Sequence, residues 1–142
     1  MKDTVNLLRE CDAGVKMGIR SIEDVLSHVK SEKLRNMLTD CKESHERIET
    51  EIEKELTRLG ASEKNPNVIA EGMSWMKSNM KLAVKDSDKT VAGLMTDGCN
   101  MGVKSLSKYL NQYEAAEEYS KDIAKKLISI ESDLAIAIRG YL

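Results

Sequence analysis

The chain has 142 residues, with 24 acidic and 22 basic side chains and a net charge of −2. Because the two signs are interspersed, no basic surface for a nucleic acid is indicated, and we expect no nucleic-acid partner. Phenylalanine is absent and proline occurs once, while Leu, Met, Ala, Glu and Lys are plentiful. This composition favours helices over strands, and the length suits a single all-α domain spanning residues 1–142.

The cysteines and the amino terminus indicate the compartment. Cys11, Cys41 and Cys99 are odd in number and have no Cys-x-x-Cys spacing, so we expect reduced, packed thiols rather than disulfides or a thiolate metal site. The amino terminus runs directly into a charged helical pattern without an apolar signal core, and no stretch has the length of a membrane span. We therefore expect a soluble, cytoplasmic protein with no membrane partner.

Residues 1–60 predict a helical hairpin. Apolar residues recur every three or four positions from about Asp3 to about Val29, with the polar Asp12 in one of these positions. Ser31 then has the character of an N-cap, and Gly60 that of a C-terminal cap. The connection is short, so the two helices are antiparallel neighbours. The apolar stripe of the second helix is the most regular in the chain: Leu34, Leu38, Cys41, His45, Ile48, Ile52, Leu56 and Leu59.

Residues 61–86 form the crossover between two hairpins. A linker with the only proline leads into a segment from Asn67 to Lys85 that predicts a shorter helix. Its methionines have a spacing that would also suit a thioether site for Cu(I), but packing against a core or an interface is the stronger interpretation, since methionine fills irregular gaps. The apolar residues of this segment are Val68, Ile69, Met73, Trp75, Met76, Met80, Leu82 and Val84.

Residues 87–142 predict a second hairpin. Asp86, Ser87 and Asp88 mark a break and a cap, and a turn near Glu114 separates the two helices. The expected stripe of the first helix is Val91, Leu94, Met95, Met101, Leu106, Tyr109, Leu110 and Tyr113. That of the last helix is Ala116, Tyr119, Ile123, Leu127, Ile130, Leu134, Ile138 and Tyr141.

The chain contains an internal repeat. Residues 14–22 read GVKMGIRSI and residues 98–106 read GCNMGVKSL, so that both contain Gly-x-x-Met-Gly. The stripes of the second and last helices also align, which indicates a duplicated hairpin. A long connection between two hairpins places the second and third long helices parallel, as in a four-helix bundle with one crossover.

Such a bundle resembles the ferritin-like fold. More narrowly, the chain is similar to a bacterial ferritin-like family of unknown function whose helical crossover carries a Gly-x-x-Trp-Met pattern, here Gly72 to Met76, after a Leu-Gly pair, here Leu59 and Gly60. The resemblance implies an all-α, ferritin-like four-helix bundle of two similar antiparallel hairpins with a helical crossover. Ferritin-like di-metal proteins carry inward Glu residues on two helices and Glu-x-x-His motifs on the other two.

Only a fragment of that ligand set is present. His45 lies in an apolar stripe, but Lys42 stands where the motif has Glu, and the matching level of the last helix holds Ala124 and Leu127. Glu131 and Asp133 flank the last stripe without a histidine. His45 and Asp12 are therefore only weak metal candidates, and we expect no di-metal centre, no cofactor and no catalytic residue. We favour the interpretation that His45 is a core residue. A neighbouring side chain, such as Asp12 or one at the level of Lys16 on the first helix, would then satisfy its ring.

The repeated glycines leave two interpretations open. Gly14, Gly18, Gly98 and Gly102 each cost about 1 kcal/mol relative to alanine inside a helix. They provide either close helix approach, which we favour, or room for a small ligand between the first and third helices. A nucleophilic role for Cys99 is a remote option.

The expected function is that of a non-catalytic protein acting through protein association, with a symmetric homo-oligomer as the simplest assembly. The interface residues we expect are those of the crossover: Met73, Trp75, Met76 and Met80. Two alternatives remain. One is a metal-binding or oxidoreductase protein with an atypical site, and the other is a small-ligand or sensor module that uses the glycine-lined centre.

Overall fold

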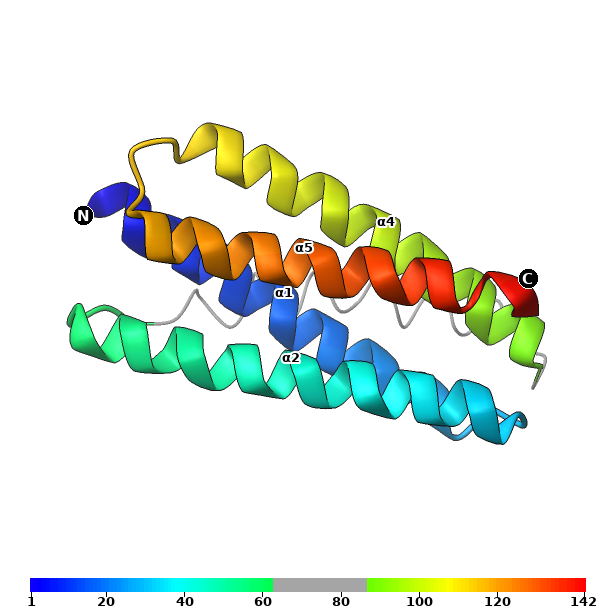
Figure 1. Cartoon of the computed structure of the whole chain (residues 1–142). Coiled ribbons are helices and arrows are strands. Elements are labelled where there is room, and N and C mark those ends of the chain that lie inside the picture. The colour runs from blue at the N-terminus through cyan, green and yellow to red at the C-terminus, as the bar shows by residue number, and fades with distance from the viewer. Residues whose placement is uncertain (63–86) are drawn as a thin grey trace.

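The computed structural model describes residues 1–62 and 87–142. This part of the chain contains helices and no strand, as the composition predicted. The helices are α1 (Lys2–Leu26), α2 (Glu32–Arg58), α4 (Asp88–Gln112) and α5 (Glu118–Ala137), followed by the short 3-10 helix η1 (Arg139–Tyr141). They lie side by side as a four-helix bundle (Figure 1). Most of the expected crossover, with its four interface residues, lies outside the described residues.

The helices form two hairpins, α1 with α2 and α4 with α5. Figure 1 shows that α2 and α4 run in one direction while α1 and α5 run in the other, as expected for a long connection between the hairpins. Among the described helices, none is both long and apolar enough to cross a membrane.

The predicted helix ends are confirmed at three positions. The Ser31 hydroxyl accepts a hydrogen bond from the Leu34 amide at 3.2 Å, and the Ser87 hydroxyl accepts one from the Thr90 amide at 3.1 Å. These side chains satisfy amides that have no partner within the first turn of a helix. Gly60 has a φ of 66°, a conformation that glycine adopts without steric cost, and it follows the end of α2.

Side-chain caps also fasten one hairpin to the other at both ends of the bundle. At one end, the two carboxylate oxygens of Asp88 accept from the amides of Lys30 at 2.7 Å and Ser31 at 3.0 Å. At the opposite end, the Thr4 hydroxyl accepts from the amide of Glu117 at 2.9 Å. The turn of each hairpin is thus bonded to the first turn of a helix in the other.

The described helices bury two apolar clusters. One surrounds Leu7, Val15, Ile52 and Leu127, and the other surrounds Ile22, Leu38, Met95, Leu134 and Ile138. The predicted stripe of α2 is confirmed, with every member buried except the half-buried Leu59.

The stripes of the two glycine-containing helices need correction. On α4, Met101 is 42% exposed, and Cys99 occupies the core instead. Residues 95, 99, 102 and 106 follow the spacing of three and four that keeps side chains on one helical face, whereas residue 101 leaves it. On α1 the residues Leu7, Cys11 and Val25 are fully buried. They lie outside the stripe that the apolar spacing predicted there, which was Val5, Leu8, Val15, Ile19, Ile22, Leu26 and Val29.

Candidate functional site

A polar layer separates the two apolar clusters, and each long helix contributes one residue to it. Gly18 comes from α1, His45 from α2, Gly102 from α4 and Glu131 from α5. On each helix the layer residue lies between positions that belong to the two clusters. His45 is 1% exposed and Glu131 9%, so that both ionisable groups are inside the bundle.

His45 and Glu131 form a buried ion pair. The Nε2 atom of His45 lies 2.9 Å from Oε1 of Glu131, and its Nδ1 atom lies 2.8 Å from the backbone carbonyl oxygen of Cys41. A carbonyl oxygen only accepts hydrogen bonds, so Nδ1 carries a proton. An ionised Glu131 also only accepts, so Nε2 carries one too. The geometry therefore fits an imidazolium ring held between two acceptors.

Burial is the largest single influence on the pKa of His45, and it lowers the pKa. Hydrogen bonds to the Cys41 side chain and to Glu131, together with the negative charge of Glu131, outweigh burial and raise the pKa from 6.5 to about 10. Because a buried charge is stable only beside a counter-ion, Glu131 is what allows His45 to remain charged at neutral pH.

The repeated glycines make the space for this pair. A Cβ atom at Gly18 would lie 2.7 Å from Nε2 of His45, and one at Gly102 would lie 3.4 Å from the carboxyl carbon of Glu131. The other glycine of each repeat has more room. A Cβ atom at Gly14 would lie 3.9 Å from Leu127, and one at Gly98 would have no described residue within 4 Å. The second glycine of each repeat therefore accommodates a side chain from another helix.

Two cysteines adjoin the layer, and the third lies elsewhere. The sulfur of Cys41 is 3.6 Å from Nδ1 of His45. Cys99 is 1% exposed, and burial, followed by the charge of Glu131, raises its pKa. Cys11 lies in the other apolar cluster, where burial and the nearby Glu10 and Asp12 raise its pKa to about 12.

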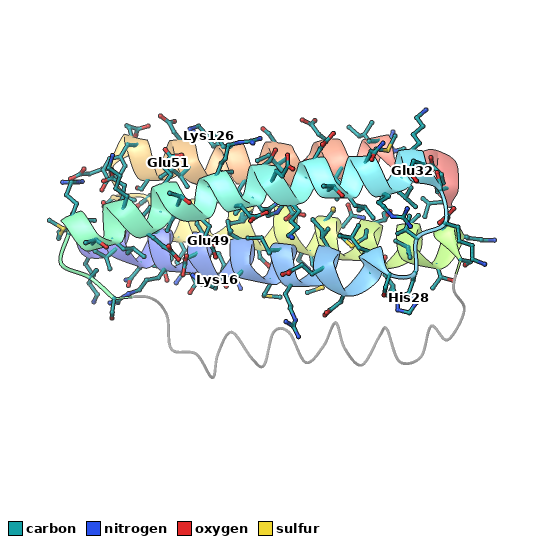
Figure 2. All side chains as sticks on the ribbon, turned by 90° about the horizontal axis from the view of Figure 1, so that it is seen from below. Lys16, His28, Glu32, Glu49, Glu51 and Lys126 are labelled. Atoms are coloured by element: carbon teal, nitrogen blue, oxygen red, sulfur yellow. The ribbon has the colours of Figure 1, made fainter. Side chains whose placement is uncertain are left out.

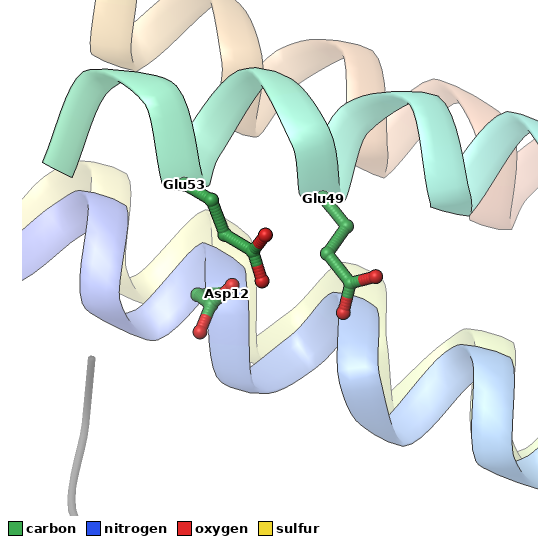
Figure 3. Close-up of side chains that lie close together, drawn as sticks. All are labelled: Asp12, Glu49 and Glu53. Carbon is green, nitrogen blue, oxygen red and sulfur yellow. The ribbon is translucent and has the colours of Figure 1, made fainter. Parts of the chain in front are cut away.

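A second polar cluster lies between α1 and α2. Asp12, Glu49 and Glu53 place carboxylate oxygens within 4.8 Å of one another, and Figure 3 shows the three side chains converging. Lys16 adjoins all three, with its Nζ 2.6 Å from Asp12, 3.4 Å from Glu53 and 3.7 Å from Glu49. Figure 2 shows Lys16 and Glu49 together at this seam. Partial burial is the largest cause of the raised pKa of Glu49, and the negative charges of Glu53 and Asp12 add to it.

The structure separates the two residues that the sequence nominated as metal candidates. Asp12 is fully buried, as its place in the stripe indicated, but it pairs with Lys16 rather than with His45. The partner of His45 is Glu131, which we had placed beside the stripe. The available signal was positional, because Glu131 lies four residues after Leu127 and three before Leu134, both buried.

These donors do not fit a ferritin-like di-metal centre, in which four carboxylates and two histidines converge. The central layer supplies one carboxylate and one imidazole, which neutralise each other, and two glycines. In the cluster around Asp12, an ammonium group already neutralises part of the negative charge. Neither of these two clusters therefore supplies the ligands of a ferritin-like di-metal centre.

Comparisons with protein-family models, curated proteins and solved structures gave no match.

Proposed function

We propose that the protein is a non-catalytic, ferritin-like helical bundle built from two related hairpins, and that it acts by associating with copies of itself. The observation that carries the non-catalytic part is the His45–Glu131 pair at 2.9 Å. His45 is the residue that the sequence aligned with the histidine of the ferritin-like motif, and its ring pairs with a carboxylate instead of standing among metal-ligating carboxylates. A mutually neutralising pair in that position supports a structural role for the layer.

The space around the pair supports the same interpretation. The backbone of Gly18 adjoins His45, and the backbone of Gly102 adjoins Glu131. At Gly18 the space is too small even for a methyl group. A substrate or metal in this layer would have to displace a buried charged side chain from its counter-ion, which is energetically costly.

The proposal of self-association rests on the apolar residues of the crossover. The crossover supplies Met73, Trp75, Met76 and Met80 in addition to the stripes that the four described helices bury against one another. Ile136 on α5 is 55% exposed, but single exposed apolar side chains are common on monomers and need no partner. Large apolar patches are uncommon on monomers, and symmetric pairing is the commonest way to cover them.

Light scattering on the purified chain, over micromolar concentrations, tests the association. We expect the mass of a dimer or a larger symmetric assembly, and a monomer at every concentration would reject the proposal. Trp75→Ser should weaken the assembly, while the matched control Ile136→Ser, which removes an exposed apolar side chain from α5, should not. If only Ile136→Ser weakens it, association stands but the contact lies on α5.

Elemental analysis tests the non-catalytic part. We expect no stoichiometric iron or manganese in protein purified without chelators. About two ions per chain would instead support the alternative, a metal-binding or oxidoreductase protein with an atypical site.

A further inference from the structure

An open groove of about 300 Å³ runs along the seam between α2 and α5. Cys41 is among its lining residues, together with the carboxylates of Asp40 and Asp133 and apolar side chains that include Leu134. Cys41 is 7% exposed, so that only a small part of this residue is accessible. A small molecule in the groove therefore lies against this residue.

Behind Cys41 lies the ion pair of the central layer. The sulfur is 3.6 Å from Nδ1 of His45, and Nε2 on the far side of the ring is 2.9 Å from Glu131. A thiol, an imidazole and a carboxylate thus form a chain that leads from the groove into the bundle. A negatively charged sulfur would have the His45 imidazolium as an immediate counter-ion, which is the arrangement that activates a cysteine as a nucleophile.

The other two cysteines lack this combination. Cys11 and Cys99 are 0% and 1% exposed, against 7% for Cys41. Burial raises the pKa of both thiols, which disfavours the reactive thiolate. They serve as internal controls for any measurement on Cys41.

We propose that Cys41 is a modification site that reacts with small uncharged oxidants of the hydroperoxide class. In the reaction, the Cys41 thiolate attacks one peroxide oxygen, an S–O bond forms and the O–O bond breaks. Sulfur loses two electrons, the peroxide gains them, and the departing hydroxide takes a proton from solvent to become water. The product is a sulfenic acid at Cys41.

The groove sets the selectivity. Asp40 and Asp133 are both exposed carboxylates at this groove, and they repel an anionic reagent from the sulfur. The low exposure of Cys41 restricts access to small reagents. Hydrogen peroxide meets both conditions.

The first experiment treats the intact chain with hydrogen peroxide, traps sulfenic acid with dimedone and maps the product by peptide mass spectrometry. We expect Cys41 to be labelled at least about tenfold faster than Cys11 and Cys99, since it alone combines access with a cationic neighbour. Equal labelling of the three cysteines, or faster labelling of either control cysteine, would overturn the proposal. This comparison needs no variant and does not depend on how one folds.

A second experiment tests the role of the ion pair. Glu131→Gln removes the carboxylate that keeps His45 charged and should slow the reaction of Cys41 severalfold, while the exposed control Glu46→Gln should leave the rate unchanged. Circular dichroism establishes that both variants are folded. An unchanged rate in folded Glu131→Gln would show that the imidazolium has no part in the reactivity.

A third experiment tests the selectivity with two alkylating reagents of similar size. Iodoacetamide is neutral and iodoacetate is anionic. The ratio of their reaction rates, iodoacetamide over iodoacetate, should be larger for Cys41 than for a free cysteine model compound. The excess should disappear in Asp40→Asn combined with Asp133→Asn. Its persistence in that double variant would refute the role of the two carboxylates.

Discussion

His45 on α2 lies against the backbone of Gly18 on α1, so closely that a methyl group at Gly18 would be 2.7 Å from the Nε2 atom of the ring. The ring has little freedom to move away, because both nitrogens are hydrogen-bonded. The glycine and the buried histidine therefore depend on each other. This relationship explains why a glycine that weakens α1 as an isolated helix stabilises the bundle as a whole.

The first prediction follows from that contact. Gly18→Ala should destabilise the protein by about 1–3 kcal/mol, because an extra methyl in a packed interior forces the neighbouring side chain from its position. Gly98→Ala is the matched control, since Gly98 lies in the second copy of the repeat and the added methyl would have no neighbour within 4 Å in residues 1–62 and 87–142. There the substitution should stabilise the protein by about 0.5–1 kcal/mol, through the higher helix propensity of alanine. Urea denaturation of both variants measures the difference, and the same sign for both would contradict it.

The second prediction concerns pH. The pKa of His45 in the folded protein, about 10, lies above the ordinary histidine value of 6.5. The folded state therefore holds this proton more tightly, and the resulting stability is fully present below about pH 6.5 and is lost as the pH rises through about 10. The free energy of unfolding should fall between these values in the native chain. In His45→Gln this part of the fall should be missing, and equal falls in both proteins would show that His45 is not the titrating group.

The regular parts of the fold were predictable because their signals are local. The stripe of α2 repeats every three or four residues without a gap, and Ser31, Ser87 and Gly60 mark helix ends through residue types that cap helices. On α4 the glycine at position 102 contributes no apolar side chain to the core face. The stripe was consequently followed through Met101, which is exposed, and Cys99 was missed.

The central pair was only partly predictable, because the spacing of Glu131 from Leu127 and Leu134 indicated its burial but not its partner. A glutamate flanking an apolar stripe is normally a surface residue, and Glu131 is buried only because His45, 86 residues earlier, supplies a counter-ion. Similarly, the expected partner of His45 was Asp12 or a side chain at the level of Lys16, but these two residues lie one helical turn apart and pair with each other. Which charged residue meets which depends on how the hairpins pack, and the sequence pattern does not contain that information.

The third prediction concerns Asp88, whose carboxylate joins the α1–α2 turn to the start of α4. Asp88→Ala removes the acceptor for the Lys30 and Ser31 amides and should cost about 1–2 kcal/mol. Asp88→Asn keeps one oxygen acceptor and should cost less. The exposed neighbour Lys89 provides a control, because Lys89→Ala should change stability by less than about 0.5 kcal/mol. Thermal or urea unfolding ranks the three variants, and an effect of Lys89→Ala as large as that of Asp88→Ala would contradict the role of the carboxylate.

The last prediction concerns Lys16 and uses Lys126 as its control. Lys16 is mostly buried and contacts three carboxylates, including the fully buried Asp12, whereas Lys126 forms an exposed pair with Glu51 at 3.5 Å (Figure 2). Lys16→Met should therefore destabilise the protein by about 1–3 kcal/mol, since it leaves buried negative charge without its ammonium partner. Lys126→Met should cost no more than about 0.5 kcal/mol, because exposed ion pairs contribute little.

The same pair of variants distinguishes a structural cluster from a cation site. If Lys16 acts as the internal cation of the Asp12, Glu49 and Glu53 carboxylates, millimolar manganese or calcium should raise the melting temperature of Lys16→Met and leave the native chain and Lys126→Met unchanged. Removing the metal with a chelator should reverse the gain. Equal stabilisation of all three proteins would show that the ion binds elsewhere, and stabilisation of the native chain alone would show that Lys16 does not occupy the place of a cation.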